Sequence, residues 1–321
     1  MPVSVRPELS AFAQDVAEGL SRAGQKKIPP RYFYDELGSA LFEAITLLPE
    51  YGLTRADERI LRSRAKEIAA EAGLVSIVAE LGSGSGKKTK HILEALSTKQ
   101  SKIIYRPIDV SAAALAVCER ELSESCEVRV VCDDWMEGLS KVVSARGRDE
   151  RLLLLFLGSS IGNFDRQDIP GFLQSVRRHL RPGDLFLVGA DLAKDVEMTL
   201  AANDDPTGVT AAFNLNLLAR INRELDADFD LRSFTHEARW DYAHRRIEMH
   251  LRSTRDQAVY VGALDTVFTF GAGETIWTES SHKFTVSELA SYARAGGFTV
   301  SAVWVDEEWP FAEALWQAWN Q

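Results

Sequence analysis

The chain has 321 residues, of which 45% are apolar and 26% charged, an ordinary composition for a globular protein that argues against a disordered or fibrous chain. Its 37 basic and 47 acidic residues give a net charge of −10, which disfavours nucleic acid as a partner because most of the surface repels phosphate. No apolar run approaches the roughly 18 residues of a membrane helix, the charged N-terminus is unlike a signal peptide, and three cysteines are too few for a disulfide framework. We therefore expect the chain to stay in the cytoplasm without a membrane partner, and we also expect it to be a monomer. The six histidines show no metal-ligand spacing, so no metal site is expected.

The first quarter of the chain predicts three amphipathic helices, over residues 7–26, 39–48 and 54–72. Pro29 and Pro30 exclude helix between the first and the second, and Pro49 ends the second. Thr54 is the expected N-cap of the third helix, and Gly73 is its expected end.

From residue 75 onward, short apolar runs alternate with helical stretches, which is typical of a parallel sheet built from βαβ units. The predicted strands are 76–81, 103–110, 128–132, 152–157 and 185–189. This rhythm is lost after Asp191. The remaining predicted elements are a helix at 211–224, antiparallel segments at 246–251 and 259–270, a helix at 286–295 and a last strand at 299–305. The pattern predicts an α/β fold with helices on both faces of the sheet and an interwoven second α+β region.

The strongest motif is a glycine loop between the first predicted strand and the helix after it, Val78-Ala-Glu-Leu-Gly-Ser-Gly-Ser-Gly-Lys-Lys-Thr89. A phosphate-binding P-loop fails because Leu81 and Lys88 stand where it needs glycine and Ser or Thr. The dinucleotide pattern needs glycine at Lys87, so a nicotinamide site is weakened without being excluded. An S-adenosylmethionine site fits in full, through Glu80, Gly82, Gly84 and Gly86.

Acidic residues follow the next two predicted strands. Asp109 ends the second strand, where a carboxylate can accept hydrogen bonds from both ribose hydroxyls of a nucleoside. Asp134 lies beside Trp135, which places a carboxylate for an adenine amino group next to a ring that can cover the base. Helix capping or a solvated turn is the alternative role for each acid, but together with the glycine loop they favour a cofactor site.

Motifs spread over nearly the whole chain resemble the histidine Nα-methyltransferases of ergothioneine biosynthesis. They are Phe33-Tyr-Asp35 with Gly38-Ser39, Leu48-Pro-Glu-Tyr51, Glu80-Leu-Gly-Ser-Gly84, Leu157-Gly-Ser-Ser-Ile-Gly-Asn163, Gly208-Val-Thr-Ala-Ala-Phe213 and Ser281-His-Lys-Phe284. The resemblance implies a class I methyltransferase domain with a Rossmann-like sheet, over 60–195 and 285–321. It also implies a substrate-binding domain over 1–59 and 196–284.

The resemblance also implies roles for single residues. S-adenosylmethionine would be contacted by Gly82, Lys88, Asp109, Asp134 and Trp135. The amino-acid substrate would be held by Tyr51, Asn163, Glu279 and Ser281, with Met249 and Tyr34 nearby and Tyr34 as the candidate catalytic residue. The local sequence allows these roles but also simpler ones.

The simpler roles follow from the sequence around each residue. The Asn163 amide can donate to a carboxylate, or it can serve in a turn. Glu279 and Ser281 lie two apart in an extended segment, so they face the same side, which could equally be a solvated face. Met249 shares a face with apolar neighbours, so core packing is its default role.

One position departs from the family pattern. Where the family usually has a tyrosine that helps to grip the substrate carboxylate, this chain has Asn203, which reaches much less far. Our first hypothesis is methylation of the α-amino group of L-histidine, up to three times. The alternatives are methylation of another amino acid or of an imidazole nitrogen, and a non-catalytic protein that binds the nucleoside cofactor and regulates a partner.

Overall fold

The computed structural model describes residues 9–319, and their contacts divide the chain into two compact units. Unit 1 comprises the residues up to Ile45, Thr199–Asp241 and Ile247–Ser280. Unit 2 comprises Thr46–Met198, Tyr242–Arg246 and the residues from Ser281 onward. Both units are therefore assembled from segments far apart in the sequence. The division into functional domains that we expect from the sequence remains a prediction.

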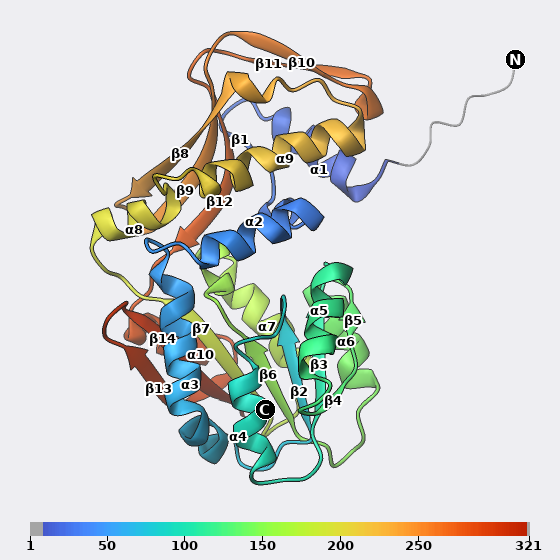
Figure 1. Ribbon diagram of the computed structural model, residues 1–321, viewed down its shortest axis with the longest axis vertical. Coiled ribbons are helices and arrows are strands. Elements are labelled where there is room, and N and C mark those ends of the chain that lie inside the picture. The colour runs from blue at the N-terminus through green and yellow to red at the C-terminus, as the bar shows by residue number, and fades with distance from the viewer. Residues whose placement is uncertain (1–8, 320–321) are drawn as a thin grey trace, which may run out of the picture. The chain divides into compact units, whose positions relative to one another are not determined.

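Unit 2 is built on an eight-stranded sheet. Its strands are β2 (Ile77–Leu81), β3 (Ile104–Asp109), β4 (Glu127–Val128), β5 (Val131–Cys132), β6 (Leu152–Phe156), β7 (Leu185–Asp191), β13 (Phe298–Asp306) and β14 (Phe311–Ala318). They are ordered β13-β14-β7-β6-β2-β3-β4, and β5 also pairs with β3 (Figure 1). The pairs from β7 to β4 are parallel, and β14 runs antiparallel to both of its neighbours. The predicted parallel sheet is confirmed.

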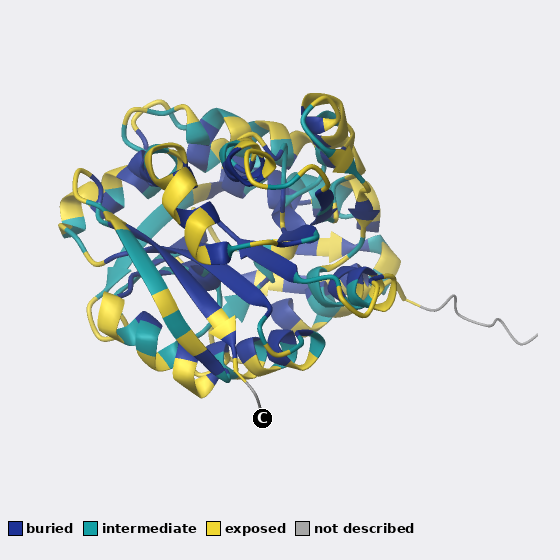
Figure 2. Cartoon of the chain, turned by 90° about the horizontal axis from the view of Figure 1, so that it is seen from below, coloured by how far each residue is buried: buried dark blue, intermediate teal, exposed yellow. Residues whose placement is uncertain are grey.

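Helices cover both faces of this sheet. The helices of unit 2 are α3 (Gly52–Ala72), α4 (Lys90–Ser97), α5 (Ala112–Leu122), α6 (Trp135–Ser144), η2 (Ser160–Asn163), α7 (Ile169–His179) and α10 (Val286–Ala295). Alternate residues of β6 point to opposite faces, so Leu152 and Leu154 join a core with α6, α7 and α10, whereas Leu153 and Leu155 join a core with α3, α4 and α5. The central strands are buried along their length (Figure 2).

The structure corrects several boundaries predicted for unit 2. The predicted strand 128–132 is two short strands, β4 and β5, because the chain leaves the ladder between them. Helix α3 begins at Gly52 after Tyr51, so the N-cap predicted at Thr54 is wrong, while its end at Gly73 is confirmed. The strand predicted last, at 299–305, is β13, and β14 follows it with almost every residue buried.

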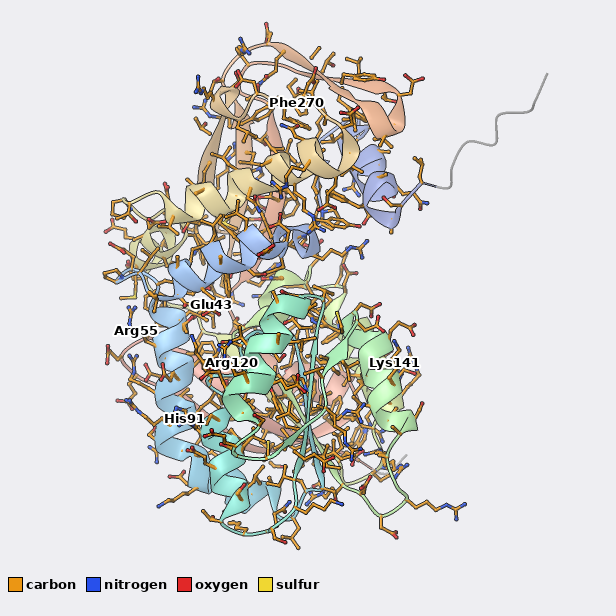
Figure 3. All side chains as sticks on the ribbon, turned by 45° about the vertical axis from the view of Figure 1, so that its right-hand side comes forward. Glu43, Arg55, His91, Arg120, Lys141 and Phe270 are labelled. Atoms are coloured by element: carbon orange, nitrogen blue, oxygen red, sulfur yellow. The ribbon has the colours of Figure 1, made fainter. Side chains whose placement is uncertain are left out.

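Unit 1 combines helices with a four-stranded sheet and a separate antiparallel pair of strands. Its helices are α1 (Ala11–Leu20), η1 (Pro30–Phe33), α2 (Glu36–Thr46), α8 (Val196–Asn203), α9 (Val209–Leu225), η3 (Leu231–Ser233) and η4 (Gly262–Leu264). The strands β1 (Lys26–Lys27), β12 (Thr275–His282), β9 (Arg246–Ser253) and β8 (Phe234–Asp241) form one sheet in that order, and β10 (Gln257–Val261) pairs with β11 (Thr266–Phe270). Figure 3 labels Phe270 of β11. Its ring is buried and packs edge-on against that of Phe234.

The predictions for unit 1 are right in type and less accurate in extent. The helix predicted over 7–26 is α1, which ends at Leu20, and residues 7 and 8 lie outside the described part of the chain. The segment predicted as extended over 259–270 is a hairpin, because η4 and a left-handed Asp265 reverse the chain between β10 and β11. Within residues 9–319, no helix combines the length and apolar character that crossing a membrane would require.

Candidate active site

The glycine loop connects the carboxyl end of β2 to α4 in unit 2. Gly82, Gly84 and Gly86 all have positive φ, at 70°, 52° and 68°, a conformation that other residues adopt only with strain. A Cβ at Gly86 would lie 2.6 Å from Cys118 Sγ, whereas the space beside Gly84 is open to at least 4 Å. The loop therefore bends sharply against the protein on one side and leaves its backbone open to a ligand on the other.

Asp109, at the carboxyl end of the neighbouring strand β3, holds this loop in place. Its Oδ2 accepts a hydrogen bond from Gly84 N at 2.9 Å, and its Oδ1 accepts one from Ser111 N, also at 2.9 Å. The carboxylate thus lies beside the open stretch of backbone, where a nucleoside diol would meet it.

Asp134 and Trp135 follow β5 at the start of α6. Asp134 caps the helix through Oδ1, which accepts from Met136 N at 2.9 Å and Glu137 N at 3.1 Å, so the alternative role considered for this acid is observed. The Trp135 indole Nε1 lies 3.3 Å from the position of a Cβ on Gly82. The structure therefore brings Trp135 and the glycine loop together, as the sequence predicts.

Glu80 and Lys88 make their contacts beneath the loop. Glu80 is buried and accepts from Thr89 Oγ1 at 2.6 Å and from the Tyr105 hydroxyl. Burial raises the pKa of Glu80 to about 7, although the hydrogen bonds from Thr89 and Tyr105 favour the charged form and lower it. Lys88 forms an ion pair with Asp57 of α3.

Two acidic residues of this region were not identified from the sequence. Asp57 is fully buried, and its Oδ2 also accepts from Gly158 N at 3.1 Å, so it links the glycine loop to the loop after β6. Glu313 of β14 is fully buried, and burial together with the neighbouring Asp57 holds its pKa well above its usual range. The available signals were an aspartate on the apolar face of a helix and a glutamate inside an apolar run.

Three of the predicted substrate residues, Tyr51, Asn163 and Ser281, belong to unit 2, and all three are half-buried. Tyr51 precedes α3, Asn163 ends η2, and Ser281 is near the end of β12. A Cβ on Gly162 would lie 3.0 Å from the carbonyl oxygen of His282. Because these two residues are the chain neighbours of Asn163 and Ser281, the structure brings the two predicted substrate segments together.

The other predicted substrate residues belong to unit 1. Tyr34 ends η1, with its ring edge-on to Phe42 at 5.7 Å. Met249 on β9 is buried, and Glu279 on β12 is half-buried. The Asn203 side chain turns back on its own helix, where Nδ2 donates to the carbonyl oxygen of Thr199 at 2.9 Å.

Comparison with known proteins places this chain in a family. Residues 12–318 match the family model described as "Histidine-specific methyltransferase, SAM-dependent". The chain belongs to this family. It is therefore an S-adenosylmethionine-dependent methyltransferase, and the predicted class I fold and cofactor are confirmed.

Curated relatives cover nearly the whole chain. A histidine N-alpha-methyltransferase of Mycobacterium tuberculosis is 44% identical over 309 residues, covering 95% of this chain and 94% of that protein. Its counterpart from Mycolicibacterium smegmatis is 42% identical, with the same coverage of both chains. Ergothioneine biosynthesis protein 1 of Schizosaccharomyces pombe is 28% identical, covering 89% of this chain and 38% of that longer protein.

Proposed function

We propose that this enzyme methylates the α-amino group of L-histidine, with S-adenosylmethionine as methyl donor, up to the trimethylated betaine hercynine, as in ergothioneine biosynthesis. The observation that carries the proposal is 44% identity to a histidine N-alpha-methyltransferase along 95% of the chain. The motif that leads to Asn163 supports it, because Asp57 joins its first glycine, Gly158, to Lys88 of the glycine loop.

The cofactor would be held by Gly82, Gly84, Asp109 and the pair Asp134-Trp135. The open backbone of the glycine loop fits a ligand in close approach, and Asp109 can accept from ribose hydroxyls while it keeps its bond to Gly84. When bound, S-adenosylmethionine supplies an electrophilic methyl group. Further proposed contacts are Glu80, in the strand before the loop, and Gly86 and Lys88, in the loop itself.

The substrate would be bound by Tyr51, Asn163, Asn203, Met249, Glu279 and Ser281. In this assignment Asn163 donates to the substrate carboxylate, and Glu279 and Ser281 contact the imidazole ring. Residues 60–195 and 285–321 then form the methyltransferase domain, and 1–59 and 196–284 the substrate-binding domain.

Methyl transfer to nitrogen needs a neutral lone pair aligned with the methyl carbon at about 3 to 3.5 Å, so positioning by the protein supplies much of the rate. The substrate ammonium must first lose a proton to water, either directly or through the Tyr34 hydroxyl, whose oxygen takes that proton as its own O–H proton passes to water. Tyr34 is the proposed catalytic residue for this reason, and a Tyr34→Phe variant should lower kcat more than it raises KM.

Incubation with S-adenosylmethionine and an equimolar mixture of amino acids tests the proposal. Histidine should gain mass in steps of one methyl group and end at three, with every methyl located on the α-nitrogen by fragmentation. Asn203, where the family usually has tyrosine, keeps a second candidate open, methylation of another amino acid or of an imidazole nitrogen. Methyl groups on the ring, or preference for another amino acid, would establish that candidate instead.

We further propose that the enzyme works in the cytoplasm as a monomer on a small-molecule substrate. The net charge of −10 supports the absence of a nucleic acid partner. Light scattering coupled to size-exclusion chromatography checks the oligomeric state, where a mass near 35.7 kDa is expected.

A further inference from the structure

A buried lysine lies behind Ser281. Lys283 Nζ donates to Ser281 Oγ at 2.7 Å, and the two residues face the same side because they are two apart in extended chain. The Lys283 side chain is only 2% exposed, whereas Ser281 is half-buried. A buried cation thus contacts, from the protein side, a hydroxyl that is more accessible.

Lys283 belongs to a buried ionic cluster in unit 2. Its Nζ lies 2.8 Å from Asp191 Oδ2, while the other oxygen of Asp191 pairs with Lys194 and accepts from Trp309 Nε1 at 3.0 Å. Burial, together with the repulsion of Lys283, lowers the pKa of Lys194 to about 8 against the attraction of Asp191. Because Asp191 contacts two lysines and the Trp309 indole, it keeps one cationic neighbour and the indole donor if either lysine is removed.

The main chain fixes where the Lys283 side chain starts. Phe284 N donates to the Asp191 carbonyl oxygen at 3.0 Å, and Ala193 N donates to the Phe284 carbonyl oxygen at 2.8 Å. Arg166 Nη2 donates to the Lys283 carbonyl oxygen at 2.8 Å. The lysine is thereby anchored to the end of β7 from both sides, which restricts the positions its ammonium group can take.

The chemistry of an ammonium group decides what Ser281 can do. An ammonium has three donors and no acceptor, so the Ser281 oxygen must accept, and its single O–H must donate elsewhere. We propose that Lys283 is a positioning residue that holds Ser281 as a hydrogen-bond donor toward the substrate. The inference rests on the proposed function, in which Ser281 contacts the imidazole of histidine.

The direction of the hydrogen bonds at Glu279 and Ser281 selects one protonation form of the substrate imidazole. A carboxylate at Glu279 accepts an N–H, and a donating Ser281 needs an unprotonated nitrogen. Neutral imidazole offers one N–H donor and one unprotonated nitrogen that accepts. An imidazolium offers two N–H donors and no acceptor, and a hydrocarbon ring offers neither a donor nor an acceptor. Lys283 would therefore help to select neutral histidine, in one tautomer, over other amino acids.

Two lysine-to-methionine variants separate this role from a structural one. Lys283→Met removes the donor behind Ser281, and Lys194→Met is the matched control, since it removes a buried lysine of the same cluster and leaves the bond to Ser281 intact. For Lys283→Met we expect the KM for histidine to rise about tenfold with kcat within about twofold. Lys194→Met should keep both constants within about twofold.

A double variant tests whether Lys283 acts through the hydroxyl. If it does, Lys283→Met in a Ser281→Ala background should add nothing to the KM of Ser281→Ala alone. A Lys283→Met effect that adds in full to that of Ser281→Ala, or a KM unchanged in Lys283→Met, overturns the inference. Lys283→Arg keeps a charged donor to the Ser281 oxygen and should hold KM within about threefold. A folded arginine variant with a tenfold higher KM overturns the inference even where the methionine variant does not fold.

The same measurements separate the inference from the proposed function. If Ser281→Ala leaves the KM for histidine unchanged, the proposed substrate contact fails, and the role of Lys283 fails with it. If Ser281→Ala raises KM and Lys283→Met does not, only the role of Lys283 is wrong.

Discussion

Replacing Glu80 with glutamine should make the stability of the protein less dependent on pH. Glu80 is 3% exposed, and its carboxylate accepts from Thr89 Oγ1 and the Tyr105 hydroxyl beneath the glycine loop. Burial outweighs these donors and raises its pKa from an ordinary 4.5 to about 7. Both donors bond to Oε2, so the amide oxygen of a glutamine, which has the same shape, can accept from both of them, but glutamine cannot ionise.

The size of the effect follows from the two pKa values. Because the folded-state pKa lies above the unfolded one, the folded protein holds a proton that the unfolded chain releases. The resulting stabilisation is complete below about pH 4.5 and is lost as the pH rises through 7. One pKa unit corresponds to about 1.4 kcal/mol, so the wild type should lose about 2.5 kcal/mol from this group between about pH 5 and 8, and Glu80→Gln should not.

Urea unfolding at several pH values from about 5 to 8 measures this difference. Glu94→Gln, an exposed position on the helix that follows the loop, is the control and should follow the wild type. Other groups that titrate in this range cancel when variant and wild type are subtracted at each pH. Curves for Glu80→Gln and wild type that stay parallel over the whole range would refute the reasoning.

Two further predictions concern the cofactor and the substrate. Asp109→Ala should weaken S-adenosylhomocysteine binding about 5- to 150-fold by calorimetry, because the ribose diol and Gly84 N both lose an acceptor, and the surface variant Asp149→Asn should bind normally. Glu279→Ala should relax selectivity toward amino acids with apolar or aromatic side chains in a competition assay read by mass, because the acceptor for the ring N–H is gone. Equal wild-type activity on tryptophan and histidine would contradict this.

The sheet of unit 2 could be predicted because its residues satisfy several physical requirements at once. Buried parallel strands need continuous apolar runs, and Leu152–Phe156 meets that need on both faces of the sheet. Three glycines at alternate positions mark a loop with positive φ, whatever ligand it holds. β14 was missed because Glu313 and its flanking alanines weaken the apolar signal of Phe311–Ala318, although almost every residue of the strand is buried in the sheet.

The contacts beneath the site could not be predicted in the same way. Asp57 lies in the middle of a helix, and only the folded chain shows that it joins Lys88 to the backbone of Gly158. The bond from Lys283 to Ser281 depends on the pairing of Phe284 with the end of β7, which links residues about 90 positions apart. Sequence patterns report local conformation and periodicity, whereas these bonds depend on tertiary placement.

Asn203 is the position at which the family pattern and this chain differ, and the substitution Asn203→Tyr tests what that difference does. Its amide donates to the carbonyl oxygen of Thr199, so in this structure the side chain closes its own helix. A tyrosine would give up that bond at the end of α8, and its hydroxyl would reach farther than the amide.

If the hydroxyl reaches the substrate carboxylate, a charge-assisted hydrogen bond of about 1.5 to 3 kcal/mol should lower the KM for histidine at least tenfold. The kcat should change little, because a carboxylate contact far from the methyl group binds ground and transition states alike. Steady-state kinetics on histidine measure both constants. A loss of activity in a folded variant would mean that the site is shaped around asparagine, and it would favour a substrate other than free histidine or a nitrogen other than the α-amine.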